Sequence, residues 1–227
     1  YMANHFPKVR YYDHHSYSRS TNSIFLSANE VNTDLQFLIE LNLENEESKI
    51  VKQGRHIGGI FSAVSQASNK FVLWYRDTLK GKYYTKIRMY NLSDLDVPIK
   101  TLNLPGIIGN ITFSDTGNQL IFTGSGQLIK NSPFAPTSIK KNQVFSYNIE
   151  EASFRKITNL PGYGIRQIFS LGNDKIGLNY VHSEGTSILS VSLNDTINVN
   201  NFKDNLLFTE YEICLLYTSP SPRDQAK

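Results

Sequence analysis

One short segment of this chain occurs twice, and the interval between the copies limits the folds available to it. Residues 100–106 (KTLNLPG) recur as residues 156–162 (KITNLPG), an offset of 56 residues. Each copy leads at the same interval into a Phe-Ser pair, and weaker copies complete a set of four anchor pairs: Tyr17-Ser18, Phe61-Ser62, Phe113-Ser114 and Phe169-Ser170. A repeat of this period indicates an array of similar supersecondary units.

Each anchor pair is followed by a short polar turn and then by apolar strands. The second strands of the four units are predicted at Ile24–Leu26, Phe71–Trp74, Leu120–Phe122 and Ile176–Leu178. The third strands are predicted at Leu38–Leu43, Ile87–Leu92, Val144–Ile149 and Ile188–Leu193. The fourth strands are predicted at Lys49–Val51, Ile99–Thr101 and Arg155–Ile157, with a poor equivalent near Thr196-Ile197. Ile, Val, Phe and Tyr fill these strands, and Asn, Asp, Gly and Ser fill the gaps, as expected for half-buried strands and turns. No 3.6-residue apolar stripe long enough for a helix is present.

The predicted fold is therefore all-β: a partial β-propeller of about four four-stranded antiparallel blades. The units span roughly residues 10–54, 55–106, 107–162 and 163–204, and a fifth begins in 205–213. An ordinary β-sandwich is the alternative, but the repeated interval from Leu-Pro-Gly to Phe-Ser argues against it. The third unit is longer because of Gly124 to Asn142, which reads as a surface excursion between its second and third strands.

Part of the third unit resembles a known family. Residues 113–122 (FSDTGNQLIF) are similar to the FSPDGxxLxF hallmark of TolB-type propeller repeats, and residues 154–158 (FRKIT) are similar to the closing strand of that family, xxRxLT. The resemblance implies a turn that Asp115 caps and in which Gly117 takes a positive φ. It also implies a six-bladed ring and a periplasmic or extracellular location. Such propellers serve as partner-binding scaffolds, as gates on serine peptidases and as lyases acting on pectin fragments, so the fold alone does not decide the function.

The end of the chain resembles something else. Residues 214–224 (CLLYTSPSPRD) match a translated transposase adapter used to prepare sequencing libraries, and we expect residues 214–227 to be non-native. Without them the chain has 213 residues, and its net charge falls from +3 to +2 because Arg223, Lys227 and Asp224 are removed. On this expectation the tail interrupts the fifth unit near Leu206–Thr209. The open arc would then expose blade edges through which the fragment self-associates.

Composition excludes several function classes. The nearly neutral charge leaves no basic stripe for a nucleic-acid backbone. The single cysteine, Cys214, lies in the tail, so the rest of the chain has no disulfide, thiolate zinc site or cysteine nucleophile. The start of the chain shows no signal peptide, and no apolar run approaches the roughly 20 residues of a membrane helix. The compartment is left undetermined.

Candidate ligand-binding residues come from the loops that lead into the first strand of each blade, because these loops gather at one mouth of a propeller channel. The set that the sequence predicts there is Asp13, His14, His15, Arg55, His56, Asn110, Tyr163 and Arg166. Imidazole and guanidinium groups around a channel could bind an anionic ligand or a divalent metal. The alternative is that these are ordinary solvated loop residues, because the spacing fixes no metal ligand set.

No catalytic residue and no cofactor is predicted. The chain has no Gly-x-Ser-x-Gly nucleophile elbow and no phosphate-binding Gly-rich loop with Lys. The leading hypothesis is thus a non-catalytic scaffold that binds a protein or peptide through its channel mouth and loops. Two rivals stay open: the gating domain of a prolyl-oligopeptidase-like peptidase, and a metal-dependent oligogalacturonate-lyase-like enzyme to which His14, His15 or His56 contributes.

Overall fold

The computed structural model describes residues 9–79, 82–124, 127–129, 138–140, 142–161, 164–183, 185–193 and 199–201. For residues 9–15, 79, 82, 105, 127–129, 138–140 and 199–201 it describes the backbone alone. The expected start of a fifth unit and the expected adapter tail lie outside these residues. No helix in the described part of the chain is long and apolar enough to span a membrane.

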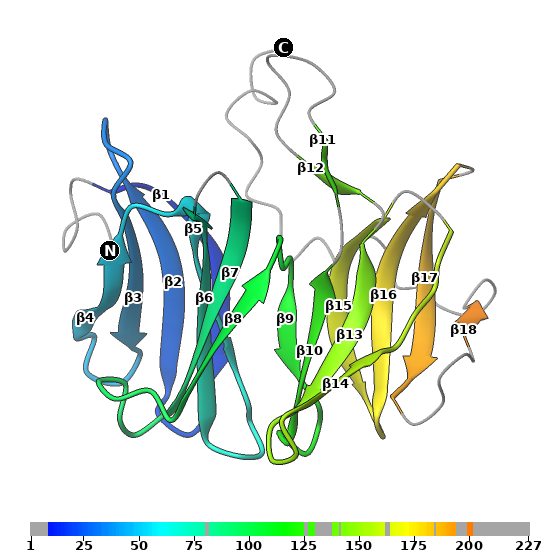
Figure 1. Cartoon of the computed structure of the whole chain (residues 1–227). Coiled ribbons are helices and arrows are strands. Elements are labelled where there is room, and N and C mark those ends of the chain that lie inside the picture. Colours follow the sequence, from blue (N-terminus) through cyan, green and yellow to red (C-terminus); the bar gives the residue numbers. More distant parts are fainter. Residues whose placement is uncertain are drawn as a thin grey trace, which may run out of the picture.

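The described chain forms four antiparallel sheets of four strands each (Figure 1). The first sheet contains β1 (Val9–Ser18), β2 (Ser23–Glu30), β3 (Gln36–Asn42) and β4 (Ser48–Gly54), and the second contains β5 (Ile57–Val64), β6 (Lys70–Leu79), β7 (Lys82–Asn91) and β8 (Lys100–Pro105). The third contains β9 (Ile111–Phe113), β10 (Gln119–Gly124), β13 (Gln143–Asn148) and β14 (Ser153–Lys156), and the fourth contains β15 (Gly164–Gly172), β16 (Lys175–His182), β17 (Gly185–Ser192) and β18 (Val199–Asn201). The predicted four-stranded antiparallel units are confirmed.

The sheets follow one another in sequence order along an arc (Figure 1). Their first strands are neighbours in turn: β1 contacts β5, β5 contacts β9, and β9 contacts β15. Three buried apolar clusters fill the spaces between consecutive sheets. They are represented by Phe25 and Phe71 between the first and second sheets, Trp74 and Leu120 between the second and third, and Ile121 and Leu178 between the third and fourth. Burial between sheets therefore provides the core.

Strand β6 explains how one sheet can serve two of these clusters. Its residues Phe71, Leu73 and Tyr75 belong to the cluster shared with the first sheet, whereas Val72 and Trp74 belong to the cluster shared with the third. Successive side chains of a strand point to opposite faces, so a continuous apolar run buries both. The sequence Phe71–Trp74 is such a run.

The turn after the first strand has the same spacing in the second and third sheets. The backbone N–H of Ser114 donates to the carbonyl of Gln119 at 3.0 Å, and that of Ser65 donates to the carbonyl of Lys70 at 2.9 Å. Ser65, and not the predicted Ser62, is therefore the equivalent of Ser114. The prediction of Phe61-Ser62 as the anchor was wrong because it followed residue identity, whereas the equivalence follows the position of the turn.

The third-sheet turn agrees with the expectation at Gly117 and differs at Asp115. Gly117 has φ +70°, as the hallmark implies. The carboxylate of Asp115, however, does not cap its own turn: it accepts hydrogen bonds from the Ser170 hydroxyl and from the backbone N–H of Asp174 at 3.3 Å. The Ser114 hydroxyl takes the capping role by accepting from Gln119 N–H at 3.2 Å.

The excursion predicted between the second and third strands of the third unit lies between β10 and β13. It contains a small hairpin that the sequence reading missed, formed by β11 (Gln127–Ile129) and β12 (Ser138–Lys140). The fourth strand of the last sheet is β18, at Val199–Asn201. The weak strand signal near Thr196-Ile197 lies outside the described residues.

Candidate ligand-binding site

The candidate site lies at the end of the sheets where the first strands begin, which we call the mouth end. The β11–β12 hairpin projects at this end and marks it at the top of Figure 1. The connections from β4 to β5 and from β8 to β9 reach the same end, because strands alternate in direction within each sheet. The predicted residues Arg55, His56 and Asn110 belong to these connections.

Bulges interrupt three of the four first strands. Pairing between β1 and β2 skips His14, pairing between β5 and β6 skips Gly58 and Gly59, and pairing between β15 and β16 skips Arg166. A bulge redirects a side chain out of the alternating pattern and is common at the rims of barrels and beside active sites. His14 and Arg166, which the sequence predicts as site residues, therefore both lie at a bulge in the first strand of a sheet.

The connection between the second and third sheets is held rigidly. The Thr85 hydroxyl donates to the Gly106 carbonyl at 3.1 Å and accepts from Ile108 N–H at 3.0 Å. The indole N–H of Trp74 donates to the Gly109 carbonyl at 3.1 Å. These bonds satisfy the backbone of a loop that packs against a buried core, as buried polar groups require.

Asn110 links this loop to the fourth sheet by a hydrogen bond. Its backbone N–H donates to the Thr123 hydroxyl at 3.1 Å, and its side-chain amide donates to the backbone carbonyl of Arg166 at 2.6 Å. The structure therefore brings together two predicted site residues from neighbouring sheets. The Arg166 side chain itself is exposed.

His56 lies between the first and second sheets. Its ring stacks on Tyr75 with centroids 4.0 Å apart, and its Nδ1 lies 3.8 Å from a carboxylate oxygen of Asp77. Both ring nitrogens are buried without a hydrogen bond. Burial lowers the pKa of His56, and the nearby Asp77 carboxylate opposes that shift. His56 is thus packed in the interface between these sheets.

The other predicted residues have different outcomes. Arg55 is exposed beside His56. The backbones of Asp13, His14 and His15 lie in β1, but their side chains are outside the described part of the chain, as is all of Tyr163. No group of three or more His, Cys, Asp or Glu side chains that could hold a metal ion occurs among the residues that the structure describes.

One residue with ordered contacts near the mouth end was not singled out from the sequence. Arg76 lies near the end of β6, and its Nε donates to the carbonyl of Ile108 at 3.1 Å. Its guanidinium carbon lies 5.5 Å from the centre of the Phe61 ring. The sequence signal was a single arginine directly after the buried run Phe71–Tyr75, where the strand periodicity places it on the face of Trp74.

Comparisons with known proteins agree on the fold. No protein-family model matches the chain, and no curated protein matches it in sequence. Among solved structures, the tricorn protease matches with a TM-score of 0.58 and 12% identity over 86% of this chain and 22% of that one. The β-propeller domain of the Trilobed protease from Pyrococcus furiosus matches with 0.54 and 11% over 85% of this chain and 57% of that domain. This chain is a partial β-propeller.

A metal-containing enzyme is also among the structures similar to this propeller. Oligogalacturonate lyase in complex with manganese matches with a TM-score of 0.54 and 11% identity, over 82% of this chain and 51% of the lyase. The propeller spans less than two thirds of the length of each of these three structures. Identities this low establish the shared fold and nothing finer.

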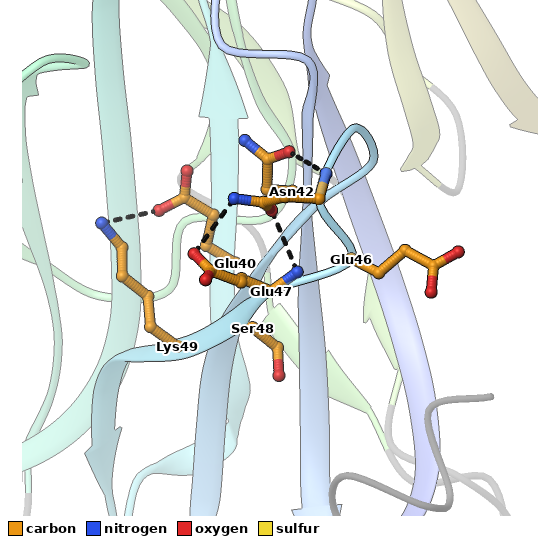
Figure 2. Close-up of a pocket in the computed structure, with 7 residues that line it drawn as sticks. Glu40, Asn42, Glu46, Glu47, Ser48 and Lys49 are labelled. Atoms are coloured by element: carbon orange, nitrogen blue, oxygen red, sulfur yellow. Dashed lines mark hydrogen bonds and ion pairs between the residues drawn. The ribbon is translucent and has the colours of Figure 1, made fainter.

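A polar hollow lies at the other end of the propeller, around the hairpin between β3 and β4 (Figure 2). Its lining includes the carboxylates of Glu40, Glu46 and Glu47. Lys49 pairs with Glu40 at 3.0 Å, and the Asn45 amide donates to Glu47 at 3.0 Å. Figure 2 shows Glu46 directed away from the other two carboxylates. The hollow is a hairpin turn with internal polar contacts, which by itself indicates no ligand.

Proposed function

We propose that this propeller is a non-catalytic binding module that recognises a protein or peptide partner through its mouth end. The supporting observation is that hydrogen bonds hold both ends of the loop from Gly106 to Asn110, one from Thr85 to Gly106 and one from Asn110 to the Arg166 carbonyl of the next sheet. The loop is therefore ordered before any partner binds. A site that is ordered in advance loses less conformational entropy on binding. Exposed Arg55 and Arg166 add charge to its rim.

The experiment is a selection of displayed random peptides on the purified full chain. Peptides enriched on the wild type are then titrated against Arg166→Ala and Asn110→Ala. The matched control is Arg19→Ala, which removes an exposed arginine from the β1–β2 turn at the opposite end. We expect at least about a tenfold loss of affinity in the mouth variants, equivalent to about 1.4 kcal/mol, and no change in the control.

Several outcomes would overturn the proposal. One is the absence of any enriched peptide, and another is peptide binding that is lost in Arg19→Ala but retained in both mouth variants. Turnover of peptide substrates or of oligogalacturonate by the purified chain would contradict a non-catalytic role. Such turnover would favour the peptidase or lyase hypothesis instead.

A further inference from the structure

The position of the Arg76 guanidinium is fixed from two sides. Its Nε is bonded to the Ile108 carbonyl, in the same loop whose Gly109 carbonyl is held by Trp74. The Phe61 ring lies 5.5 Å from the guanidinium carbon, within the range of a cation–π contact. An arginine held this way has already lost most of its rotamer freedom, and its two terminal amino groups remain available as a planar fork.

The charge of Arg76 has no described counterion. No carboxylate among the described side chains lies within ion-pair distance of it. Burial is the cause that lowers the pKa of Arg76, with no opposing carboxylate. A cation that has been partly desolvated without a partner gains more from an incoming anion than a fully hydrated one does.

One of the remaining donors of Arg76, Nη1, lies beside exposed Gly58 at the β5 bulge. Gly58 is exposed and has φ +83°, and the only atom near the position of a Cβ there is Nη1 of Arg76, at 3.4 Å. Gly58 has no side chain that could cover Nη1 on this side. This is a position where a backbone of another chain can approach closely.

The exposed charges at the mouth end have both signs. Arg55 and Arg166 are exposed there, and so is Asp34 in the connection between β2 and β3. The preference for an anion therefore rests on Arg76 itself, which forms no ion pair with a described side chain.

We propose that Arg76 is the anchor of a carboxylate-binding site, in which Nη1 and Nη2 donate in parallel to one carboxylate of the bound peptide beside Gly58. The carboxylate is either the C-terminus of the peptide or an Asp or Glu side chain. This inference rests on the proposed peptide-binding function for its biological meaning, but the site itself can be tested without a partner.

The ligand-free test compares Gly58→Asp with Gly58→Asn. Asp and Asn have the same shape and both tolerate positive φ, so backbone strain is matched. Only Asp supplies a carboxylate beside Nη1. At pH 7 we expect Gly58→Asp to melt about 2–4 °C above Gly58→Asn. The difference should disappear as the pH falls through the lowered pKa of the introduced carboxylate, and in an Arg76→Gln background. Equal melting temperatures at pH 7 would overturn the site.

The ligand test uses three pools of labelled random heptapeptides and fluorescence anisotropy. One pool has a free C-terminus and no Asp or Glu, one is amidated and contains a single Asp or Glu, and one is amidated without acidic residues. We expect one of the first two to bind the wild type at least about tenfold more tightly than the third, and Gly58→Asp or Arg76→Gln to abolish the difference while Gly58→Asn retains it. The pool that binds identifies the source of the carboxylate.

The two proposals fail differently. Equal binding of all three pools to the wild type, unchanged in Arg76→Gln, would refute the carboxylate site and leave the peptide-binding function standing. No binding by any pool, together with a higher melting temperature of Gly58→Asp, would refute the proposed function and leave an anion site. Circular dichroism of Arg76→Gln and of both Gly58 variants checks that each variant is folded.

Discussion

At the scale of single residues, the sequence predicts backbone requirements better than it predicts polar contacts. Gly117 was expected to take a positive φ and does so, because a tight turn between strands needs a residue without Cβ. Asp115 was expected to cap the same turn, yet it bonds across to the fourth sheet. Arg76 was missed for the same reason: its partners Phe61 and Ile108 are distant in sequence, and no local pattern records them.

Gly117 leads to a stability prediction with an internal control. A Cβ at Gly117 would lie 2.2 Å from the Ser68 hydroxyl and 2.4 Å from that of Ser65, so Gly117→Ala combines positive-φ strain with a clash between the second and third sheets. Gly106 has φ +82° and nothing within 4 Å of its Cβ position, so Gly106→Ala isolates the strain. We expect about 1 kcal/mol of destabilisation for Gly106→Ala and about 2–3 kcal/mol for Gly117→Ala in urea unfolding. Equal losses would show that the serines move aside freely.

His56 predicts a pH dependence. Because burial lowers its folded-state pKa below the unfolded value, the unfolded state binds a proton first as the pH falls. The stabilisation is therefore complete above the unfolded pKa of about 6.5 and is lost as the pH falls below it toward the folded-state pKa. Asp77 opposes the shift, and Lys52 and Arg88 reinforce it.

The measurement is the melting temperature between pH 7.5 and pH 5. We expect the wild type to lose stability over this range and His56→Gln to lose less. His182→Gln is the matched control, because it removes an imidazole from the fourth sheet, far from this interface. The same decline in wild type and His56→Gln would assign the pH dependence to other groups.

At the scale of elements, strand existence was predictable and strand ends were not. The predicted strands Leu120–Phe122 and Val144–Ile149 correspond to β10 and β13, but β10 extends beyond both predicted ends and β13 ends at Asn148. The bulges at Gly58–Gly59 and Arg166 were not predicted, because a bulge is a property of pairing with another strand. The bulges set the positions of the side chains in the candidate site. The sequence therefore predicted which loops contribute to the site but not how their side chains are arranged.

Asn142 tests how one sheet is joined to the next. Its side chain is 3% exposed, and its amide both accepts from Ile165 N–H at 2.6 Å and donates to the Ile165 carbonyl at 3.0 Å. Its side chain therefore makes the pair of hydrogen bonds with the backbone at the start of β15 that a neighbouring strand would otherwise make. Asn142→Ala leaves both backbone groups unpaired, and we expect about 2–4 kcal/mol of destabilisation.

Chemical denaturation measures this loss, and Asn159→Ala is the control. Asn159 is exposed and accepts only from Lys156 at 3.0 Å, so its removal should change stability by less than about 0.5 kcal/mol. If Asn142→Ala were as mild as the control, water would have to replace both bonds at the join between the third and fourth sheets.

At the scale of the whole molecule, the arc is built from pairwise contacts between consecutive sheets. Each of the three apolar clusters joins neighbours, and among the described residues no such cluster joins the first sheet to the fourth. This is the arrangement of a repeat protein, in which stability is nearly a sum of units and interfaces. The repeat in the sequence was sufficient to predict it, because each unit must bury its faces on the next.

The arc predicts self-association of the chain. On the fourth sheet, Phe169, Val181 and Ile188 are half-buried, and strand alternation places them on the face turned away from the third sheet, opposite Ile168 and Leu189. Apolar side chains on such a face gain by packing against a second copy. We expect sedimentation velocity to show association that increases with concentration.

Ile188→Lys tests whether this face is responsible, because a buried ammonium without a partner opposes packing. It should shift the sedimentation profile toward monomer, whereas Ser153→Lys, at the exposed edge strand β14, adds the same charge elsewhere and should not. A wild type that sediments as a sharp monomer at all concentrations would contradict the prediction. Association that persists unchanged in Ile188→Lys would instead indicate that the copies contact each other through the first sheet, at the other end of the described arc.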